Sequence, residues 1–203
     1  MAEHQSINYV RVAEVLTELG MITQEKAQSV VEDFGDLAHK VLKPHRHIAY
    51  ALEDFGVAVS IHADDVDFAD EEYPSLLREA AALTGGKVTV DNFRFDRDDP
   101  DDEDSGRGVL YFDRNGKELS FVIEQESNDY FDVGASQQAI EALSPDDDPR
   151  SFRCVDNSPG PSGDDVMVLA TAEQRAGLLQ HLGIRFCEPL WEHNYPAEDA
   201  GGS

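Results

Sequence analysis

A β-hairpin is the strongest constraint on the fold. Residues 108–125 read GVLYFDRNGKELSFVIEQ, with apolar and polar residues alternating on both sides of Asn115 and Gly116. An Asn-Gly pair supplies the two positive-φ positions of a type I′ turn, and pairing outward from it fixes the register of both strands. The face that we expect to be buried carries Leu110, Phe112, Leu119 and Phe121. The face that we expect to be covered less completely carries Val109, Tyr111, Ser120 and Val122.

The elements around this hairpin follow from residue spacing. Apolar residues at helical spacing predict helices over residues 75–83 and 135–143, and a T-x-x-Q capping box opens a last helix over 172–182. Alternating residues predict three more strands: 87–95, 151–155 and 166–170. In the first of them the alternation changes phase near Asp91-Asn92, which indicates a β-bulge.

This order of elements predicts the fold class. From residue 74 the chain reads helix, three strands, helix, two strands, helix. Strands segregated in this way predict an α+β domain with an antiparallel or mixed sheet of about five strands and helices on one face, in place of a doubly wound sheet.

An N-terminal helical segment precedes this domain. Its apolar spacing predicts three helices: 7–19, 23–42 and 44–55. Thr23 caps the second, and Gly35 weakens its middle. The acidic stretch 60–73 lacks periodicity, and we interpret it as a connection between the helical segment and the rest of the chain. The predicted division is a helical segment, an α+β domain and a C-terminal tail with disordered last residues: 1–60, 74–187 and 188–203.

The formal charge of -26 over 203 residues restricts the binding partners. Anionic lipid and nucleic acid would repel the chain, and no stretch approaches 18 uninterrupted apolar residues, so we expect neither membrane nor nucleic-acid binding. Two cysteines without CxxC spacing and the lack of a signal-peptide core favour a reducing cytoplasm. Two explanations of the charge stay open: attraction of a cationic partner, or a saline or GC-rich host.

Two acidic stretches are candidates for partner binding. The first, DPDDEDSG at residues 99–106, fails as an EF-hand because Phe112 occupies the place of the bidentate glutamate. A solvated loop and a contact with a cationic partner both remain readings of it. The second, EQESNDYFDVG at residues 124–134, mixes carboxylates with aromatic residues as interaction surfaces do. The predicted partner-binding residues are Asp101, Asp102, Glu103, Asp104, Glu126, Asp129 and Tyr130.

No motif predicts catalysis. GxSxG is absent, and Cys154 lies in a strand-like run where a buried, inert thiol is the expected state. Histidines and carboxylates between His39 and Asp65 offer an alternative, a metal-dependent hydrolase, although their spacing matches no compact ligand pair. We predict no catalytic residue, no metal site and no cofactor.

The layout from Ser75 to Leu182 is similar to that of type III secretion chaperones, which are small acidic cytoplasmic dimers that hold an extended segment of an effector. The acidity, the size and the stretch VMVLATAEQRAGLLQHLGIRF at residues 166–186 also resemble bacterial immunity proteins of polymorphic-toxin systems. The second resemblance implies a non-enzymatic module that neutralises a toxin by covering it. Neither resemblance assigns a functional residue.

The favoured hypothesis is therefore a cytoplasmic, acidic, immunity- or inhibitor-like protein that binds a basic partner, such as a toxin or a secreted effector. The alternatives are the chaperone-like effector-binding protein and the metal-dependent hydrolase. The sequence does not predict the oligomeric state.

Overall fold

The computed structural model describes residues 6–43, 46–62, 68–99, 101–102, 104–125, 127–156 and 164–188. The helices are α1 (Tyr9–Glu18), α2 (Gln24–Phe34), the short 3-10 helix η1 (Gly35–His39), α3 (Arg46–Asp54), α4 (Ala69–Leu83), α5 (Val133–Glu141) and α6 (Ala172–Leu182). The strands are β1 (Ala58–His62), β2 (Val90–Arg97), β3 (Gly108–Arg114), β4 (Lys117–Ile123), β5 (Ser151–Cys154) and β6 (Asp164–Ala170).

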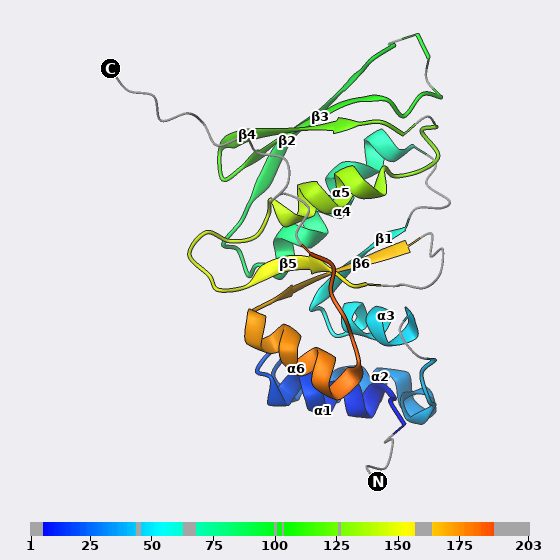
Figure 1. Cartoon of the computed structure of the whole chain (residues 1–203), viewed down its shortest axis with the longest axis vertical. Coiled ribbons are helices and arrows are strands. Elements are labelled where there is room, and N and C mark those ends of the chain that lie inside the picture. Colours follow the sequence, from blue (N-terminus) through cyan, green and yellow to red (C-terminus); the bar gives the residue numbers. More distant parts are fainter. Residues whose placement is uncertain are drawn as a thin grey trace.

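The elements form four layers (Figure 1). One outer layer is the antiparallel sheet β2-β3-β4, and α4 and α5 lie beneath it. The second antiparallel sheet, β1-β6-β5, separates these two helices from the other outer layer, which contains α1, α2, α3 and α6. The prediction of an α+β fold with N-terminal helices is confirmed.

The prediction of one sheet of about five strands with helices on one face is wrong. The described residues form six strands in two three-stranded sheets, and α4 and α5 pack between the sheets. The additional strand is β1, which pairs with β6 from Ala58 opposite Val168 to His62 opposite Asp164. β1 lies partly in the stretch that we interpreted as a connection. Its apolar run is short, and the acidic residues that soon follow it made the stretch resemble a loop.

The central sheet is buried on both faces, which explains its nearly continuous apolar sequence. Along β6, Met167 and Leu169 face the cluster formed with α4, α5 and the outer sheet. Val166 and Val168, in alternation with them, face the cluster formed with α1, α2, α3 and α6. The N-terminal helices therefore share a core with β6 and α6. The predicted division of the chain into 1–60, 74–187 and 188–203 stays a prediction, and residues 189–203 of the tail lie outside the described residues.

The hairpin and the bulge were predicted correctly. Leu110 lies opposite Phe121 and Phe112 opposite Leu119. The turn residues Asn115 and Gly116 have φ values of 52° and 77°. The predicted bulge in β2 is confirmed by a register shift between Asp91 and Arg94, where Asn92 has a φ of 51°.

Two helix boundaries differ by more than two residues from those predicted. Gly35, with a φ of 50°, ends α2 instead of weakening its middle, and η1 follows. α4 begins at Ala69, five residues before the predicted Pro74 boundary, and contains the proline. The acidic residues that we assigned to a connection occupy its first turn, where carboxylates interact favourably with the helix dipole: Asp70, Glu71 and Glu72.

No helix among the described residues has the length and apolar character needed to span a membrane.

Candidate functional site

The two stretches that were predicted to bind a partner come together at one end of the molecule. The backbone N–H of Asn128, in the β4–α5 loop, donates to the carbonyl oxygen of Asp104, in the β2–β3 loop, at 2.8 Å. Both loops also meet the start of α4, because the N–H of Ala69 donates to the carbonyl oxygen of Asn128 at 2.8 Å. We call this surface the acidic end and define it as the described residues of 68–72, 98–107 and 124–132.

Asn128 joins the three segments of the acidic end. Asn128 is only 2% exposed. Its side-chain Nδ2 donates to Asp70 Oδ1 at 2.8 Å, and its Oδ1 accepts from the backbone N–H of Asp70 at 3.2 Å. A buried amide with both ends satisfied fixes the relative positions of its partners, because any displacement leaves a polar group without a hydrogen bond.

Asp70 extends this network to the outer sheet. Its second carboxylate oxygen, Oδ2, accepts from Arg97 Nη2 at 2.7 Å. The two side chains are 15% and 19% exposed, so water screens this ion pair less than it screens a surface pair. The start of α4 is thus held to β2 on one side and to the β4–α5 loop on the other.

Asp132 fixes both ends of the β4–α5 loop. Its Oδ2 accepts from the N–H of Glu124 at 2.9 Å, at the end of β4. Its Oδ1 accepts from the N–H of Ala135 at 3.0 Å, which caps α5. The N–H of Asp132 itself donates to the hydroxyl of Tyr73 at 3.1 Å, on α4. The loop that carries Asp129 and Tyr130 is therefore anchored at both ends.

The buried phenol of Tyr73 should make the free energy of unfolding depend on pH. Burial raises the pKa of this phenol from its ordinary value of 10 to about 12, and the negative charge of Asp132 acts in the same direction. Because the folded pKa exceeds the unfolded one, the contribution of Tyr73 is complete below pH 10 and is lost as the pH rises toward 12. We expect the free energy of unfolding to fall by about 2–3 kcal/mol over this range. Urea titrations at several pH values measure this fall, which should be correspondingly smaller in Tyr73→Phe. If the free energy of unfolding fell equally with pH in both proteins, Tyr73 would not be its source.

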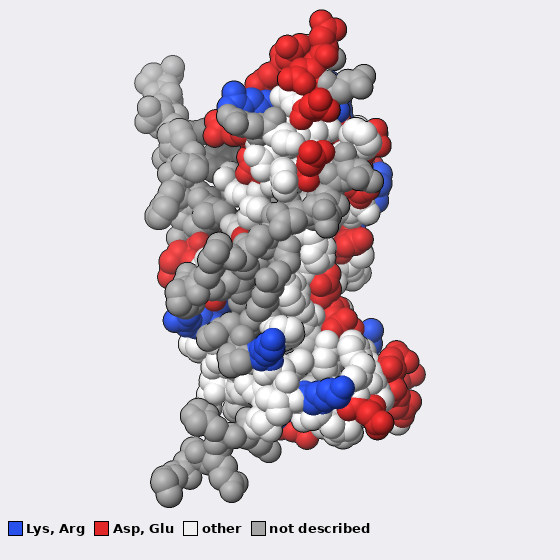
Figure 2. All heavy atoms as spheres, turned by 90° about the vertical axis from the view of Figure 1, so that its right-hand side faces the viewer, with Lys and Arg blue, Asp and Glu red and all other residues white. Residues whose placement is uncertain are grey.

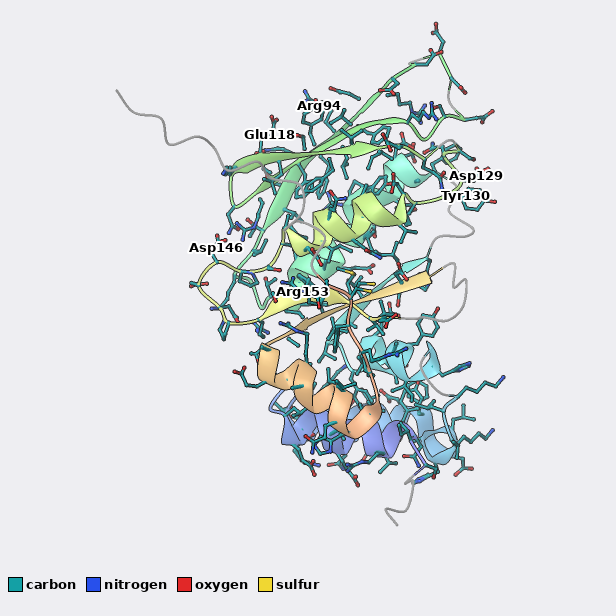
Figure 3. All side chains as sticks on the ribbon, in the orientation of Figure 1. Arg94, Glu118, Asp129, Tyr130, Asp146 and Arg153 are labelled. Atoms are coloured by element: carbon teal, nitrogen blue, oxygen red, sulfur yellow. The ribbon has the colours of Figure 1, made fainter. Side chains whose placement is uncertain are left out.

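The exposed side chains of the acidic end combine carboxylates with aromatic rings. Asp101, Asp102, Asp104 and Asp129 are all exposed. Tyr130 is 42% exposed, and Figure 3 shows it beside Asp129, pointing away from the body of the molecule. Figure 2 shows carboxylates gathered over the tip of the outer sheet. Of the predicted site residues, Glu103 and Glu126 lie outside the described residues.

Sequence reasoning missed Phe68. This residue is 50% exposed and precedes Ala69, whose N–H is bonded to the β4–α5 loop. An isolated phenylalanine among acidic residues, in the stretch DFADEEY, was the signal that could have identified it. Together with Tyr130 it places a second exposed ring among the carboxylates of the acidic end, a mixture that contact surfaces use.

Gly106 sets how closely the two loops approach. It is buried, and an added Cβ would lie 2.7 Å from the carbonyl oxygen of Ser127 and 2.9 Å from that of Gln125. Because these are backbone atoms, Gly106→Ala must push the loops apart, and we expect it to lower the free energy of unfolding by about 2 kcal/mol. Gly134→Ala, in α5, is the matched control, since its Cβ would meet nothing closer than 3.6 Å and helical alanine is favourable. Chemical denaturation compares the two variants. If they were equally stable, the close approach of Gly106 to the β4–α5 loop would be contradicted.

A groove of about 490 Å³ lies in the other outer layer, between α1 and α2. Apolar residues and two carboxylates line it: Val10, Ala13, Ala27, Val31, Glu14 and Glu18, with polar residues around them. Figure 2 also shows acidic side chains in this helical part of the molecule. The groove lies away from the acidic end and contains no predicted site residue.

The histidine-carboxylate region of the alternative hydrolase hypothesis is only partly described. His39 and His47 are exposed, whereas His45, Asp64 and Asp65 lie outside the described residues. Within the described ranges, no group of three or more His, Cys, Asp or Glu side chains is placed to hold a metal ion.

No protein-family model matches this chain, and no curated protein or solved structure matches it significantly.

Proposed function

We propose that this chain is a protein-binding module, of the immunity or inhibitor kind, that covers a basic partner protein with its acidic end. The observation that supports the proposal is the convergence of exposed carboxylates and two exposed aromatic residues, Phe68 and Tyr130, around the buried side chain of Asn128. Two loops that are distant in sequence contribute to one surface. The β4–α5 loop is held to α4 by hydrogen bonds, and the β2–β3 loop is held to the β4–α5 loop by the backbone bond between Asn128 and Asp104.

Each component has a physical role in binding. Clustered carboxylates raise the rate at which a cationic protein meets this face, and the effect weakens as salt screens the charges. Exposed aromatic rings supply contact area that is removed from water in the complex and so slow its dissociation. A surface that is already held in place by Asn128 and Asp132 loses little conformational entropy on binding.

Co-purification tests the proposal. Tagged protein is captured from its native host at low ionic strength in three forms: wild type, an acidic-end variant and a control variant. The acidic-end variant carries Asp101→Asn, Asp102→Asn, Asp104→Asn and Tyr130→Ala. The control removes three exposed carboxylates and one exposed apolar side chain elsewhere: Glu18→Gln, Asp33→Asn, Asp36→Asn and Leu179→Ala.

We expect the wild type and the control to retain a stoichiometric basic protein that elutes as salt is raised to about 0.5 M, where screening is strong. The acidic-end variant should retain at least about tenfold less, because it lacks both the steering charges and an aromatic contact. Recovery of a neutral partner, of no stoichiometric partner, or of equal amounts with all three forms would reject the proposal.

A further inference from the structure

The two cysteines lie opposite each other although they are far apart in sequence. Beyond β5, Val155 forms an antiparallel bridge with Phe186. In an antiparallel pair the next residue on one strand faces the previous one on the other, so Cys154 is opposite Cys187. The N–H of Cys187 donates to the carbonyl oxygen of Cys154 at 2.9 Å, which confirms this register.

The side chains of the pair also meet. Each thiol lies close enough to the other to influence its pKa. Directly opposite, hydrogen-bonded residues of antiparallel strands have Cα atoms about 5.5 Å apart, which lies within the range that a disulfide spans. Both cysteines are free thiols in this structure; Cys154 is buried and Cys187 is exposed.

We propose that Cys154 and Cys187 form a dithiol site that is oxidised to an intramolecular disulfide by a small-molecule disulfide. The exposed Cys187 thiolate attacks one sulfur of the oxidant, forming a mixed disulfide and releasing one thiolate. Cys154 then gives up its proton and attacks the Cys187 sulfur, which forms the Cys154–Cys187 bond and releases the second thiol. One oxidant molecule is thus reduced to two thiols while the protein loses two hydrogen atoms.

The disulfide would fasten the C-terminal segment 184–188 to β5. In the reduced protein the contacts of this segment include the Val155–Phe186 bridge with its flanking backbone hydrogen bonds, the ion pair between Arg185 and Asp156, and the burial of Ile184, which is 2% exposed. Oxidation closes a loop of roughly 30 residues that contains β6 and α6, and it removes conformational freedom from the unfolded chain. The site is independent of the acidic end.

The surroundings of the sulfurs set the conditions for oxidation. Burial raises the pKa of the Cys154 thiol, and the carboxylates of Asp165 on β6 and Glu141 on α5 act in the same direction. Burial also raises the pKa of Cys187, with Asp156 and the same two carboxylates contributing, while the hydrogen bond with Cys154 opposes them. Because only thiolates attack disulfides, the reaction should be slow at neutral pH. A test at about pH 8.5, near the ordinary thiol pKa, allows the first step to proceed.

The experiment exposes the full-length protein to glutathione disulfide at this pH and follows free thiols, mass and melting temperature. We expect the wild type to lose both thiols, form no disulfide between chains and yield one cross-linked peptide pair containing Cys154 and Cys187. Its melting temperature should rise by about 5–10 °C and return on reduction. Cys187→Ser should show no such rise.

Variants at the buried position test the second step. In Cys154→Ser, or in Cys154→Ala if the serine variant melts below the working temperature, glutathione should remain attached to Cys187. In the wild type, Cys154 should displace this glutathione from Cys187. A wild type that keeps glutathione on Cys187, forms intermolecular dimers, retains two free thiols, or oxidises without a rise in melting temperature would overturn the proposal.

Discussion

Asn128→Ala should lower the free energy of unfolding by about 3 kcal/mol. The substitution removes a buried side chain that donates to Asp70 Oδ1 and accepts from the Asp70 N–H. A carboxylate oxygen and a backbone N–H then lose their hydrogen bonds inside the protein, and unsatisfied buried polar groups, charged ones above all, are costly. Urea denaturation measures the loss.

The same substitution should also weaken partner binding, because the β4–α5 loop loses its side-chain bonds to α4 and the β2–β3 loop is in turn hydrogen-bonded to that loop. Asp129→Asn is the control for stability, since it changes an exposed neighbour of Asn128 and should alter the free energy of unfolding by less than about 0.5 kcal/mol. If Asn128→Ala were as stable as this control, the proposed role of Asn128 would be wrong.

Phe112→Ala should cost about 4 kcal/mol, the largest single effect that we expect. The ring is 0% exposed and stacks against Phe93 and Phe121, with centroids 5.8 and 5.7 Å away. Removing it creates a cavity between the outer sheet and the helices beneath it, which adds to the loss of buried apolar area.

The neighbouring residue on β3 provides the matched comparison. Tyr111 points to the opposite face, where the guanidinium of Arg94 lies 4.1 Å from its ring centroid. Tyr111→Ala should therefore cost only about 1 kcal/mol, from a partly exposed cation–π contact and some packing. Thermal or chemical denaturation of both variants tests which face of the sheet is buried. A larger loss of stability for Tyr111→Ala than for Phe112→Ala would show that the buried face carries Tyr111.

Local chemistry made parts of the fold predictable. The Asn115-Gly116 turn and the Thr171-Gln174 capping box involve residues within a few positions of each other, so their geometry follows from the residue types alone. The additional strand of the central sheet did not follow, because it depends on β1 pairing with β6 across about a hundred residues. Five residues of β1 form too short an apolar run to be assigned without that partner.

The candidate site was predictable by composition but not by geometry. Carboxylates and a tyrosine pointed to the two loops, yet the pairing of Asn128 with Asp70 joins residues that no sequence pattern relates. Phe68 was missed because its exposure depends on where α4 begins. The Cys154–Cys187 pair was missed for a similar reason, since it depends on the register of one isolated bridge.

The association rate of the captured partner, measured against ionic strength, tests the central claim most directly. Wild type, the control variant and the acidic-end variant are compared at salt concentrations from about 0.02 to 0.5 M, where the screening length falls severalfold. The account predicts a steep fall in rate for the wild type and the control, a shallow one for the acidic-end variant, and convergence of all three at high salt. Three parallel curves would show that the position of these charges is irrelevant and would contradict the account.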